Sequence, residues 1–313
     1  MSWRVLVSAP YMLPVLDEFM DVLKEHDIEV IRADVNERLS EEELLPLMAD
    51  IDGVICGDDR FTERVFQAAP KLKVISKWGT GIDSIDPEAA EKHGVKVCNT
   101  PGAFTDPVAD TVMGYVLAFA RQFPWLDRDI RAGKWQKRMG VSLHERTLGV
   151  VGVGDVGKAV ISRAIAFGMT VLGTDIVPVP ESFVQSTGLK VVSLDELLAE
   201  SDYVSLNCTL NPTSNHLISD DQLERMKDTA CLINTCRGSV VDEAALGRAL
   251  LAGKIAGAGL DVFEDEPLPE DSPLRTLDSC LLAPHNANSS PEAWQRVHVN
   301  TLHNLISVLE GAG

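Results

Sequence analysis

The stretch VVGVGDVGKAV, residues 150–160, contains a glycine-rich loop that fits two kinds of phosphate-binding site. Gly152, Gly154 and Gly157 match the dinucleotide pattern G-x-G-x-x-G, and the same segment matches the first seven positions of the triphosphate loop G-x-x-x-x-G-K. A triphosphate loop needs Ser or Thr after the lysine as a ligand for Mg²⁺, and here that position is Ala159. The dinucleotide interpretation is therefore favoured.

The sequence around the loop supports this interpretation. The apolar run TLGVV precedes the glycines, the helix-like segment KAVISRAIAFG follows them, and the next apolar run, MTVLGTD, ends in Asp175. A carboxylate at this place accepts hydrogen bonds from the adenosine ribose and repels a 2′-phosphate, so the sequence predicts NAD rather than NADP. A solvated turn residue is the alternative for Asp175. Asp155 puts a negative charge beside the expected pyrophosphate position, and only an outward-pointing side chain avoids that conflict.

Short β-branched runs alternate with helix-length segments along the whole chain, as in parallel sheets with crossover helices. Two such series are separated by a long apolar helical pattern at residues 106–123, which ends at Pro124, and by an irregular segment at residues 125–146. The sequence therefore predicts an α/β fold of two doubly wound parallel-sheet domains. A last helical pattern, residues 291–309, could return to the first domain.

Composition excludes several classes of partner. The 313 residues are 45% hydrophobic and carry a formal net charge of −19, which repels nucleic acid and anionic membranes. No apolar run is long enough to span a membrane, and Arg4 and two prolines interrupt the place of a signal peptide, so we expect a cytoplasmic protein. The six cysteines are expected to be free, and the spacing of Cys231 and Cys236 does not indicate a metal site.

Three reactive side chains follow predicted strands of the second series: Arg237 after ACLINT, Glu266 after IAGAGL and His285 after CLLAP. Ligands of open α/β sheets lie beyond the carboxyl ends of the strands, where the glycine loop also lies. Arg237 can hold a substrate carboxylate, and His285 can give a proton to a carbonyl oxygen as hydride reaches its carbon. A carboxylate beside the imidazole would keep that proton available near neutral pH. A strand-end ion pair, a solvated acid and a packing histidine are the plainer alternatives.

Several motifs occur in order along nearly the whole chain: KWGTGIDSID, NTPGAFTDPVADTV, GKWQ, TLGVVGVGDVGKAV, NCTLNPTSNHLI, INTCRGSVVDEAAL, GAGLDVFEDEPL and LLAPH. Together they resemble the D-isomer-specific 2-hydroxyacid dehydrogenases, which include phosphoglycerate dehydrogenase and glyoxylate/hydroxypyruvate reductases. The resemblance implies a Rossmann NAD-binding domain, residues 101–284, inserted into a flavodoxin-like substrate domain, residues 1–100 and 285–313. It also implies a homodimer, with a dimerisation arm at about residues 121–146.

The resemblance implies a role for each site residue. Arg237, Glu266 and His285 would form the catalytic triad, and Asp261 would bond the nicotinamide carboxamide. The substrate-binding set is Lys77, Gly79, Thr80, Gly81, Arg237 and His285, with the backbone of residues 79–81 holding the substrate carboxylate. The cofactor-binding set is Gly152, Gly154, Asp155, Val156, Gly157, Asp175, Cys208, Thr209, Thr235, Cys236, Asp261 and His285.

The expected activity is NAD-dependent interconversion of a small D-2-hydroxy acid and its 2-oxo acid, of the 3-phosphoglycerate, glycerate/hydroxypyruvate or glyoxylate type. The arm carries seven Lys or Arg and three acidic residues. This positive charge can focus an anionic substrate, and a solvated dimer arm with scattered charges is the plainer alternative. Lys77 raises the hypothesis of a second negative charge on the substrate, such as a phosphate. Asp110, Thr209 and the run from Asn286 to Asn288 depart from the family pattern and leave the substrate open. Formate dehydrogenases resemble the chain less, because glutamine replaces Glu266 there. The alternative to an enzyme is a binding protein that senses NAD(H), like the family's corepressors.

Overall fold

The structure, a computed structural model, describes residues 2–311, and the chain forms two compact units. Unit 1 comprises residues 1–104 and 290–313, and unit 2 comprises residues 105–289. These limits differ by four or five residues from the expected domain boundaries. The difference matters at one place: residues 285–289 group with unit 2, so His285 belongs to the same unit as the glycine loop.

Unit 1 is built on a five-stranded parallel sheet with the order β2-β1-β3-β4-β5. The strands are β1 (Trp3–Val7), β2 (Ile28–Arg32), β3 (Gly53–Cys56), β4 (Val74–Lys77) and β5 (Lys96–Cys98). This order is that of flavodoxin-like doubly wound folds. Every residue of β3 and β4 is buried, as expected for central strands covered on both faces.

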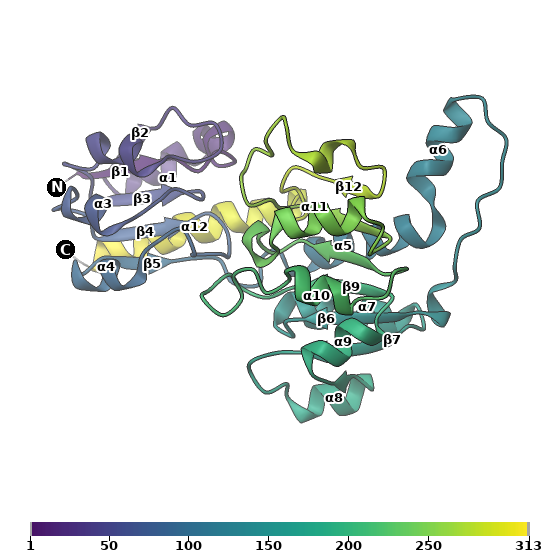
Figure 1. Ribbon diagram of the computed structural model, residues 1–313. Coiled ribbons are helices and arrows are strands. Elements are labelled where there is room, and N and C mark those ends of the chain that lie inside the picture. Colours follow the sequence, from purple (N-terminus) through teal and green to yellow (C-terminus); the bar gives the residue numbers. More distant parts are fainter. Residues whose placement is uncertain (1, 312–313) are drawn as a thin grey trace. The chain divides into compact units, whose positions relative to one another are not determined.

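Helical segments from both ends of the chain cover the unit 1 sheet. Its helical segments are η1 (Leu13–Phe19), α1 (Met20–Glu25), α2 (Glu41–Leu44), η2 (Leu45–Leu47), α3 (Glu63–Gln67), α4 (Pro87–Lys92) and α12 (Pro291–Gly311). The C-terminal helix α12 packs along β3, β4 and β5, and Ser76 Oγ donates to the Thr301 carbonyl at 2.8 Å (Figure 1). The predicted return of residues 291–309 to the first domain is therefore confirmed.

Unit 2 is built on a seven-stranded parallel sheet with the order β12-β11-β10-β9-β6-β7-β8. The strands are β6 (Thr147–Val151), β7 (Thr170–Thr174), β8 (Lys190–Val191), β9 (Tyr203–Leu206), β10 (Cys231–Asn234), β11 (Gly257–Leu260) and β12 (Cys280–Leu282). Strand order reverses between β6 and β9, and such a switch point is where doubly wound sheets bind ligands. The prediction of two doubly wound parallel sheets is confirmed.

Alternating residues of the unit 2 strands supply two cores. Val150 and Ile233 face the core beneath α5 and α7, and Leu206 and Leu232 face the core beneath α9, α10 and α11. The helical segments of unit 2 are α5 (Thr105–Arg121), α6 (Phe123–Arg131), η3 (Leu143–Glu145), α7 (Asp155–Ala166), α8 (Glu181–Thr187), α9 (Leu194–Glu200), α10 (Asp220–Arg225), η4 (Gly238–Val240), α11 (Glu243–Leu251) and η5 (Pro273–Thr276).

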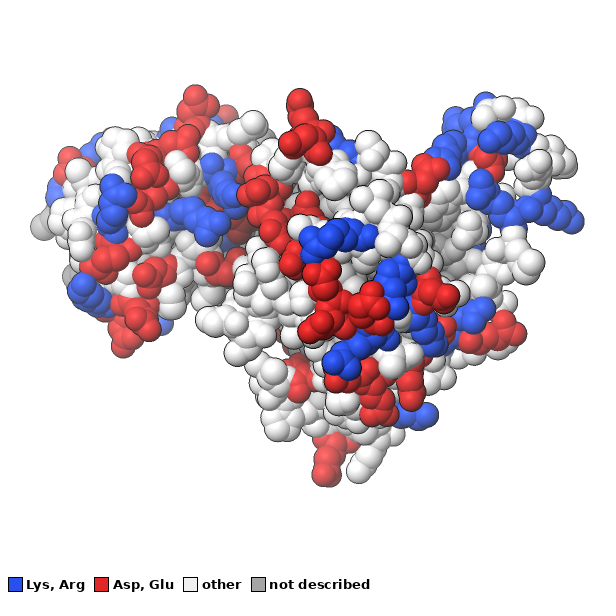
Figure 2. All heavy atoms as spheres, viewed as in Figure 1, with Lys and Arg blue, Asp and Glu red and all other residues white. Residues whose placement is uncertain are grey.

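The segment after α5 is partly helical, which the irregular pattern of residues 125–146 did not predict. Gln122 adopts a left-handed conformation (φ 61°), and Pro124 lies in the first turn of α6, where a missing amide hydrogen costs no helical bond. Residues 134–142 then have no regular structure. Figure 1 shows α6 standing off from the unit 2 sheet, and Lys and Arg side chains gather over it in Figure 2.

Candidate active site

The glycine loop joins β6 to α7 at the switch point of the unit 2 sheet. Gly152 has φ +89°, and a Cβ there would lie 2.8 Å from the backbone of Asn207. A Cβ on Gly157 would lie 2.0 Å from the carbonyl oxygen of Gly152. Both positions therefore require glycine: the loop lies against the chain that follows β9 at Gly152, and the first turn of α7 lies against the loop at Gly157.

The first turn of α7 offers amides to an anion. Among residues 2–311, the backbone amides of Gly154, Asp155 and Val156 donate to no other protein group. Such amides, together with the helix dipole, bind phosphate groups. The Asp155 side chain is exposed, so its charge lies in solvent, which removes the conflict raised by the sequence.

Asp175 lies directly beside this loop at the end of β7. Its carboxylate accepts hydrogen bonds from the amide of Val153 at 2.6 Å and from that of Val177 at 2.9 Å. The side chain is only partly exposed. These two bonds hold a negative charge at the tip of the glycine loop, where a dinucleotide presents its adenosine ribose.

His285 and Glu266 form a hydrogen-bonded pair. Nδ1 of His285 lies 2.9 Å from Oε2 of Glu266, and the two side chains are 30% and 28% exposed. Oε1 of Glu266 accepts a hydrogen bond from the Phe263 amide at 3.0 Å, which orients the carboxylate. The carboxylate engages Nδ1, and Nε2 is the ring nitrogen on the side of the imidazole away from that contact.

Asp261 holds the turn on which His285 lies. His285 has a left-handed backbone (φ 51°), and its amide donates to the Asp261 carbonyl at 2.7 Å. The Asp261 carboxylate accepts the amides of Asn286 at 2.8 Å and Ala287 at 2.9 Å. Burial raises the pKa of Asp261, and the two amide bonds oppose that rise. The residue therefore positions His285; its implied bond to nicotinamide stays a prediction.

Arg237 follows β10, the strand that lies beside β11. Its carbonyl accepts a hydrogen bond from Nδ2 of Asn234 at 2.9 Å, and its Nη1 donates to the Cys236 carbonyl at 2.8 Å. A Cβ on Gly238 would lie 1.9 Å from the carbonyl carbon of Phe263. The chain after Arg237 therefore touches the segment that leads to Glu266. Three adjacent strands, β10, β11 and β12, precede the three residues of the predicted triad.

The other predicted cofactor residues lie at the ends of β9 and β10. Cys208 adjoins the glycine loop, because its amide nitrogen lies 2.8 Å from the place of a Gly152 Cβ. Thr209 is exposed. Thr235 is 8% exposed, and its hydroxyl has no hydrogen-bond partner within residues 2–311. These residues fit a dinucleotide. The glycine loop and the amides at the start of α7 suit its phosphates, the Asp175 carboxylate suits its ribose, and the Thr235 hydroxyl is left for a further hydrogen bond.

The predicted substrate loop lies in unit 1, after β4. Gly79 has φ +135°, and its carbonyl accepts the amide and the hydroxyl of Thr100, each at 2.9 Å. Nδ2 of Asn99 donates to the Thr80 carbonyl at 2.6 Å. The amides of residues 79–81 donate to no other group in the described part of the chain. They are therefore available to an anion such as a carboxylate.

The positive charge of Lys77 is less available to bind a substrate than the position of the residue suggests. The residue is 3% exposed, and its Nζ donates to Oδ1 of Asp58 at 2.9 Å. The Asp58 side chain is 42% exposed and carries the opposite charge. The pair leaves little net positive charge for a second anionic group of the substrate.

Two polar contacts, one in each unit, were not predicted from the sequence. Tyr115 donates its hydroxyl to the Leu260 carbonyl at 3.2 Å, and burial, followed by the charge of Asp261, raises its pKa. In unit 1, His298 is buried and accepts a hydrogen bond from Trp78 Nε1 with its Nδ1 at 2.9 Å. Tyr115 lies within an apolar helical pattern and the partners of both residues come from distant segments, so no local signal identifies them.

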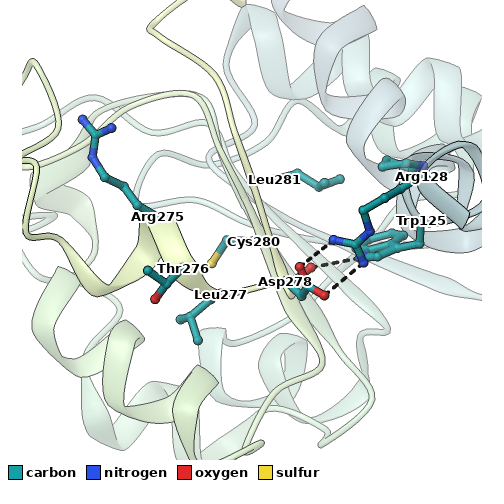
Figure 3. A pocket seen from close by; sticks show the side chains of 9 residues that line it. Trp125, Arg128, Arg275, Thr276, Leu277, Asp278, Cys280 and Leu281 are labelled. Carbon is teal, nitrogen blue, oxygen red and sulfur yellow. Dashed lines mark hydrogen bonds and ion pairs between the residues drawn. The ribbon is translucent and has the colours of Figure 1, made fainter. Parts of the chain in front are cut away.

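A separate pocket of about 220 Å³ lies in unit 2 between α6 and residues 275–281 (Figure 3). Arg128 pairs with Asp278 through contacts of 2.6 and 2.9 Å. Arg275 donates to the carbonyls of Pro269, at 2.8 Å, and Leu268. Both guanidinium groups are thus engaged, and none of the predicted site residues lines the pocket.

Comparisons with known proteins show to which family the chain is similar. Residues 113–287 match the family model described as D-isomer specific 2-hydroxyacid dehydrogenase, NAD binding domain. A glyoxylate reductase of Korarchaeum cryptofilum is 44% identical over 81% of this chain and 78% of its own. A D-3-phosphoglycerate dehydrogenase of Methanocaldococcus jannaschii is 38% identical over 95% of this chain and 56% of its own. The crystal structure of a D-lactate dehydrogenase from Aquifex aeolicus, complexed with NAD and lactic acid, has a TM-score of 0.90 and 28% identity and covers 98% and 96% of the two chains.

Proposed function

The chain belongs to the D-isomer specific 2-hydroxyacid dehydrogenase family, and from this premise we propose that His285 is its acid and base and Glu266 its orienting carboxylate. The protein is an NAD-dependent enzyme that interconverts 2-hydroxy acids and 2-oxo acids. The observation that carries the proposal is the 2.9 Å bond between the imidazole and the carboxylate. It supports a histidine whose Nε2 is directed to substrate.

Each residue of the triad has a distinct role in this proposal. Nε2 of His285 donates a proton to the carbonyl oxygen of a 2-oxo acid and removes it from the hydroxyl of a 2-hydroxy acid. Glu266 favours the protonated imidazole and keeps Nδ1 engaged. Arg237 binds the substrate carboxylate through a two-point ion pair. Bound NAD(H) supplies or accepts the hydride. The amides of residues 79–81 are a further proposed carboxylate-binding element.

The cofactor would be held by the glycine loop and Asp175. The open amides at the start of α7 suit a pyrophosphate, and Gly152 and Gly157 allow the backbone to approach it. The remaining proposed contacts come from Cys208, Thr209, Thr235, Cys236 and Asp261. We propose NAD rather than NADP, because the Asp175 carboxylate would repel a 2′-phosphate.

Replacing Asp175 with alanine is expected to relax this discrimination. The ratio of kcat/KM with NADH to that with NADPH should fall by about 10-fold or more, because an uncompensated charge repulsion is worth on the order of 1–3 kcal/mol. Steady-state kinetics with both cofactors measures the ratio. Asp195→Ala, in the exposed first turn of α9, is the matched control and should not change it. An unaltered ratio in Asp175→Ala would remove the ribose assignment.

We propose a small unphosphorylated substrate of the glyoxylate or hydroxypyruvate type. The support is the Lys77–Asp58 pair, which weighs against the hypothesis of a second anionic group bound at Lys77. Relatives described both as glyoxylate reductase and as D-3-phosphoglycerate dehydrogenase match the chain, so identity alone does not separate the two types.

Turnover of glycerate is expected to be at least as efficient as turnover of 3-phosphoglycerate. NADH depletion with glyoxylate, hydroxypyruvate, phosphohydroxypyruvate and pyruvate, with kcat/KM for each, tests this in the direction of reduction. A preference of 10-fold or more for the phosphorylated acid would restore the phosphate hypothesis. Binding of NADH without turnover of any 2-oxo acid would instead support the NAD(H)-sensing alternative.

We also propose that the enzyme is a homodimer that uses α6 and the segment after it. Trp135 and Met139 are 92% and 94% exposed there, and large apolar side chains this exposed on a protruding segment are typical of an interface. None of the helices in residues 2–311 combines the length and apolar character needed to cross a membrane. A cytoplasmic location stays a prediction.

A further inference from the structure

Two cysteines lie opposite each other at the ends of adjacent strands in unit 2. Strands β9 and β10 are parallel, and their register pairs Leu206 with Asn234. Cys208 and Cys236 each stand two residues beyond these strand ends, and both side chains pack against the core beneath α9, α10 and α11. Each thiol is the largest influence on the acidity of the other, which makes the two side chains close neighbours. All six cysteines of the chain are free thiols.

The two thiols differ in acidity. The hydrogen bond from Cys236 lowers the pKa of Cys208, and the same bond, with burial, raises the pKa of Cys236 well above its usual value. Sγ of Cys236 also lies 3.1 Å from Oδ1 of Asn234, so this thiol has two acceptors within reach. Burial raises the pKa of the four other cysteines, which are Cys56, Cys98, Cys231 and Cys280.

We propose that Cys208 and Cys236 form a site of reversible oxidation, at which a peroxide converts the two thiols into a disulfide. The Cys208 thiolate attacks the O–O bond of hydrogen peroxide, which gives a sulfenic acid on Cys208 and one water. Sγ of Cys236 then displaces the hydroxyl of the sulfenic acid, which leaves with the Cys236 proton as a second water. The two sulfurs lose two electrons in total, and one peroxide gains them. An excess of a small dithiol reverses the reaction.

The backbone spacing is compatible with this bond. The two strands that end two residues before these cysteines are neighbours, which lie about 4.7–4.9 Å apart, and disulfides join residues whose Cα atoms are about 4.4–6.8 Å apart. Closing the disulfide therefore needs only a local adjustment of the two strand ends. Both cysteines are half-buried rather than enclosed, so a molecule as small as hydrogen peroxide can reach them.

Oxidation is expected to affect cofactor binding, and this part of the inference rests on the proposed function. The amide nitrogen of Cys208 adjoins Gly152 of the glycine loop, and Cys236 directly precedes Arg237. A disulfide would draw together the segments that carry these two residues. We expect it to weaken NADH binding several-fold and to lower turnover, both reversibly. Bound NADH should in turn cover the pair and slow its oxidation.

Mass spectrometry of the full chain tests the site without relying on activity. The reduced protein is treated with graded hydrogen peroxide, the remaining thiols are alkylated, and the peptides are mapped. The expected product is a cross-link between the peptides of Cys208 and Cys236, with a loss of about 2 Da that dithiothreitol reverses. Cys236→Ser should instead stop at a sulfenic acid on Cys208, which dimedone traps. Cys98→Ser, a control at a half-buried thiol in unit 1, should still form the cross-link.

Two results would overturn the proposal. One is alkylation of both Cys208 and Cys236 after treatment that oxidises other cysteines of the chain. The other is cross-linking that involves the remaining cysteines as readily as this pair. NADH titration by fluorescence, before and after oxidation, reports the consequence separately. A cross-link in a protein that turns over no 2-oxo acid would contradict the proposed function alone, and an active enzyme that forms no cross-link would contradict this inference alone.

Discussion

His285→Ala is expected to lower kcat by about 10²–10⁴-fold, because the variant has no group that can transfer the proton while hydride moves. Affinity for NADH should persist, since the glycine loop and Asp175 are untouched. Pre-steady-state measurement of NADH oxidation, together with a binding titration, separates the two quantities. His285 has a left-handed backbone, in which alanine is strained. His285→Asn tolerates that backbone and should lose activity to a similar extent.

The chain offers a matched control for this experiment. His216 also has a left-handed backbone, and its Nε2 lies 3.0 Å from Oε1 of Glu264. Like His285, it therefore combines a left-handed backbone with a neighbouring carboxylate, here Glu264 instead of Glu266, and it does not belong to the proposed site. His216→Ala should keep near-normal kcat. Comparable losses in both variants would indicate a structural effect, and near-normal turnover of His285→Asn would refute the assignment of His285.

Arg237→Gln is expected to lower kcat/KM for a 2-oxo acid by about 10²–10³-fold. Hydrogen bonds to charged groups contribute roughly 1.5–3 kcal/mol each, and a guanidinium can make two of them to a carboxylate. The loss should fall mainly on KM if the ion pair is equally strong in the ground state and the transition state. Arg237→Lys should recover only part of it, because an ammonium group lacks the fork geometry.

Steady-state kinetics over a wide range of substrate concentration measures this effect. Arg248, on α11, is paired with Asp220 at 2.7 Å and lies outside the proposed site, so Arg248→Gln is the matched control. Its kcat/KM should be unchanged. A normal KM in Arg237→Gln would assign carboxylate binding elsewhere, and the amides of residues 79–81 would then be the first alternative.

The glycine loop and the sheet were predictable because their signals are local. Alternation of apolar runs with helical patterns indicated two parallel sheets. The assignment of one domain as Rossmann and the other as flavodoxin-like came from the family resemblance rather than from the residues. Gly152 and Gly157 occur where a tight turn has no room for a side chain, and the spacing to Asp175 spans one helix and one strand. Each of these features depends on a contiguous stretch of chain.

The triad was predictable in part. Carboxyl ends of parallel strands meet at one edge, so Arg237 and His285 could be placed together from their positions after strands. Glu266 could not be separated from the acidic turn around it, because three acidic side chains, Glu264, Asp265 and Glu266, stand in a row. The hydrogen bonds to His285 and to the Phe263 amide distinguish it. Asp261 was assigned to the cofactor, yet both of its oxygens accept amides of the turn after His285.

The amino-acid order alone thus determined the class of fold, the dinucleotide loop and the strand ends that carry reactive side chains, because periodicity and steric demands act between near neighbours. Only the tertiary structure decided which charged side chains form ion pairs and which cysteines are neighbours. The Lys77–Asp58 pair and the opposed Cys208 and Cys236 depend on strand order and register. Those are properties of segments far apart in the chain, and hydrogen bonding in three dimensions sets them.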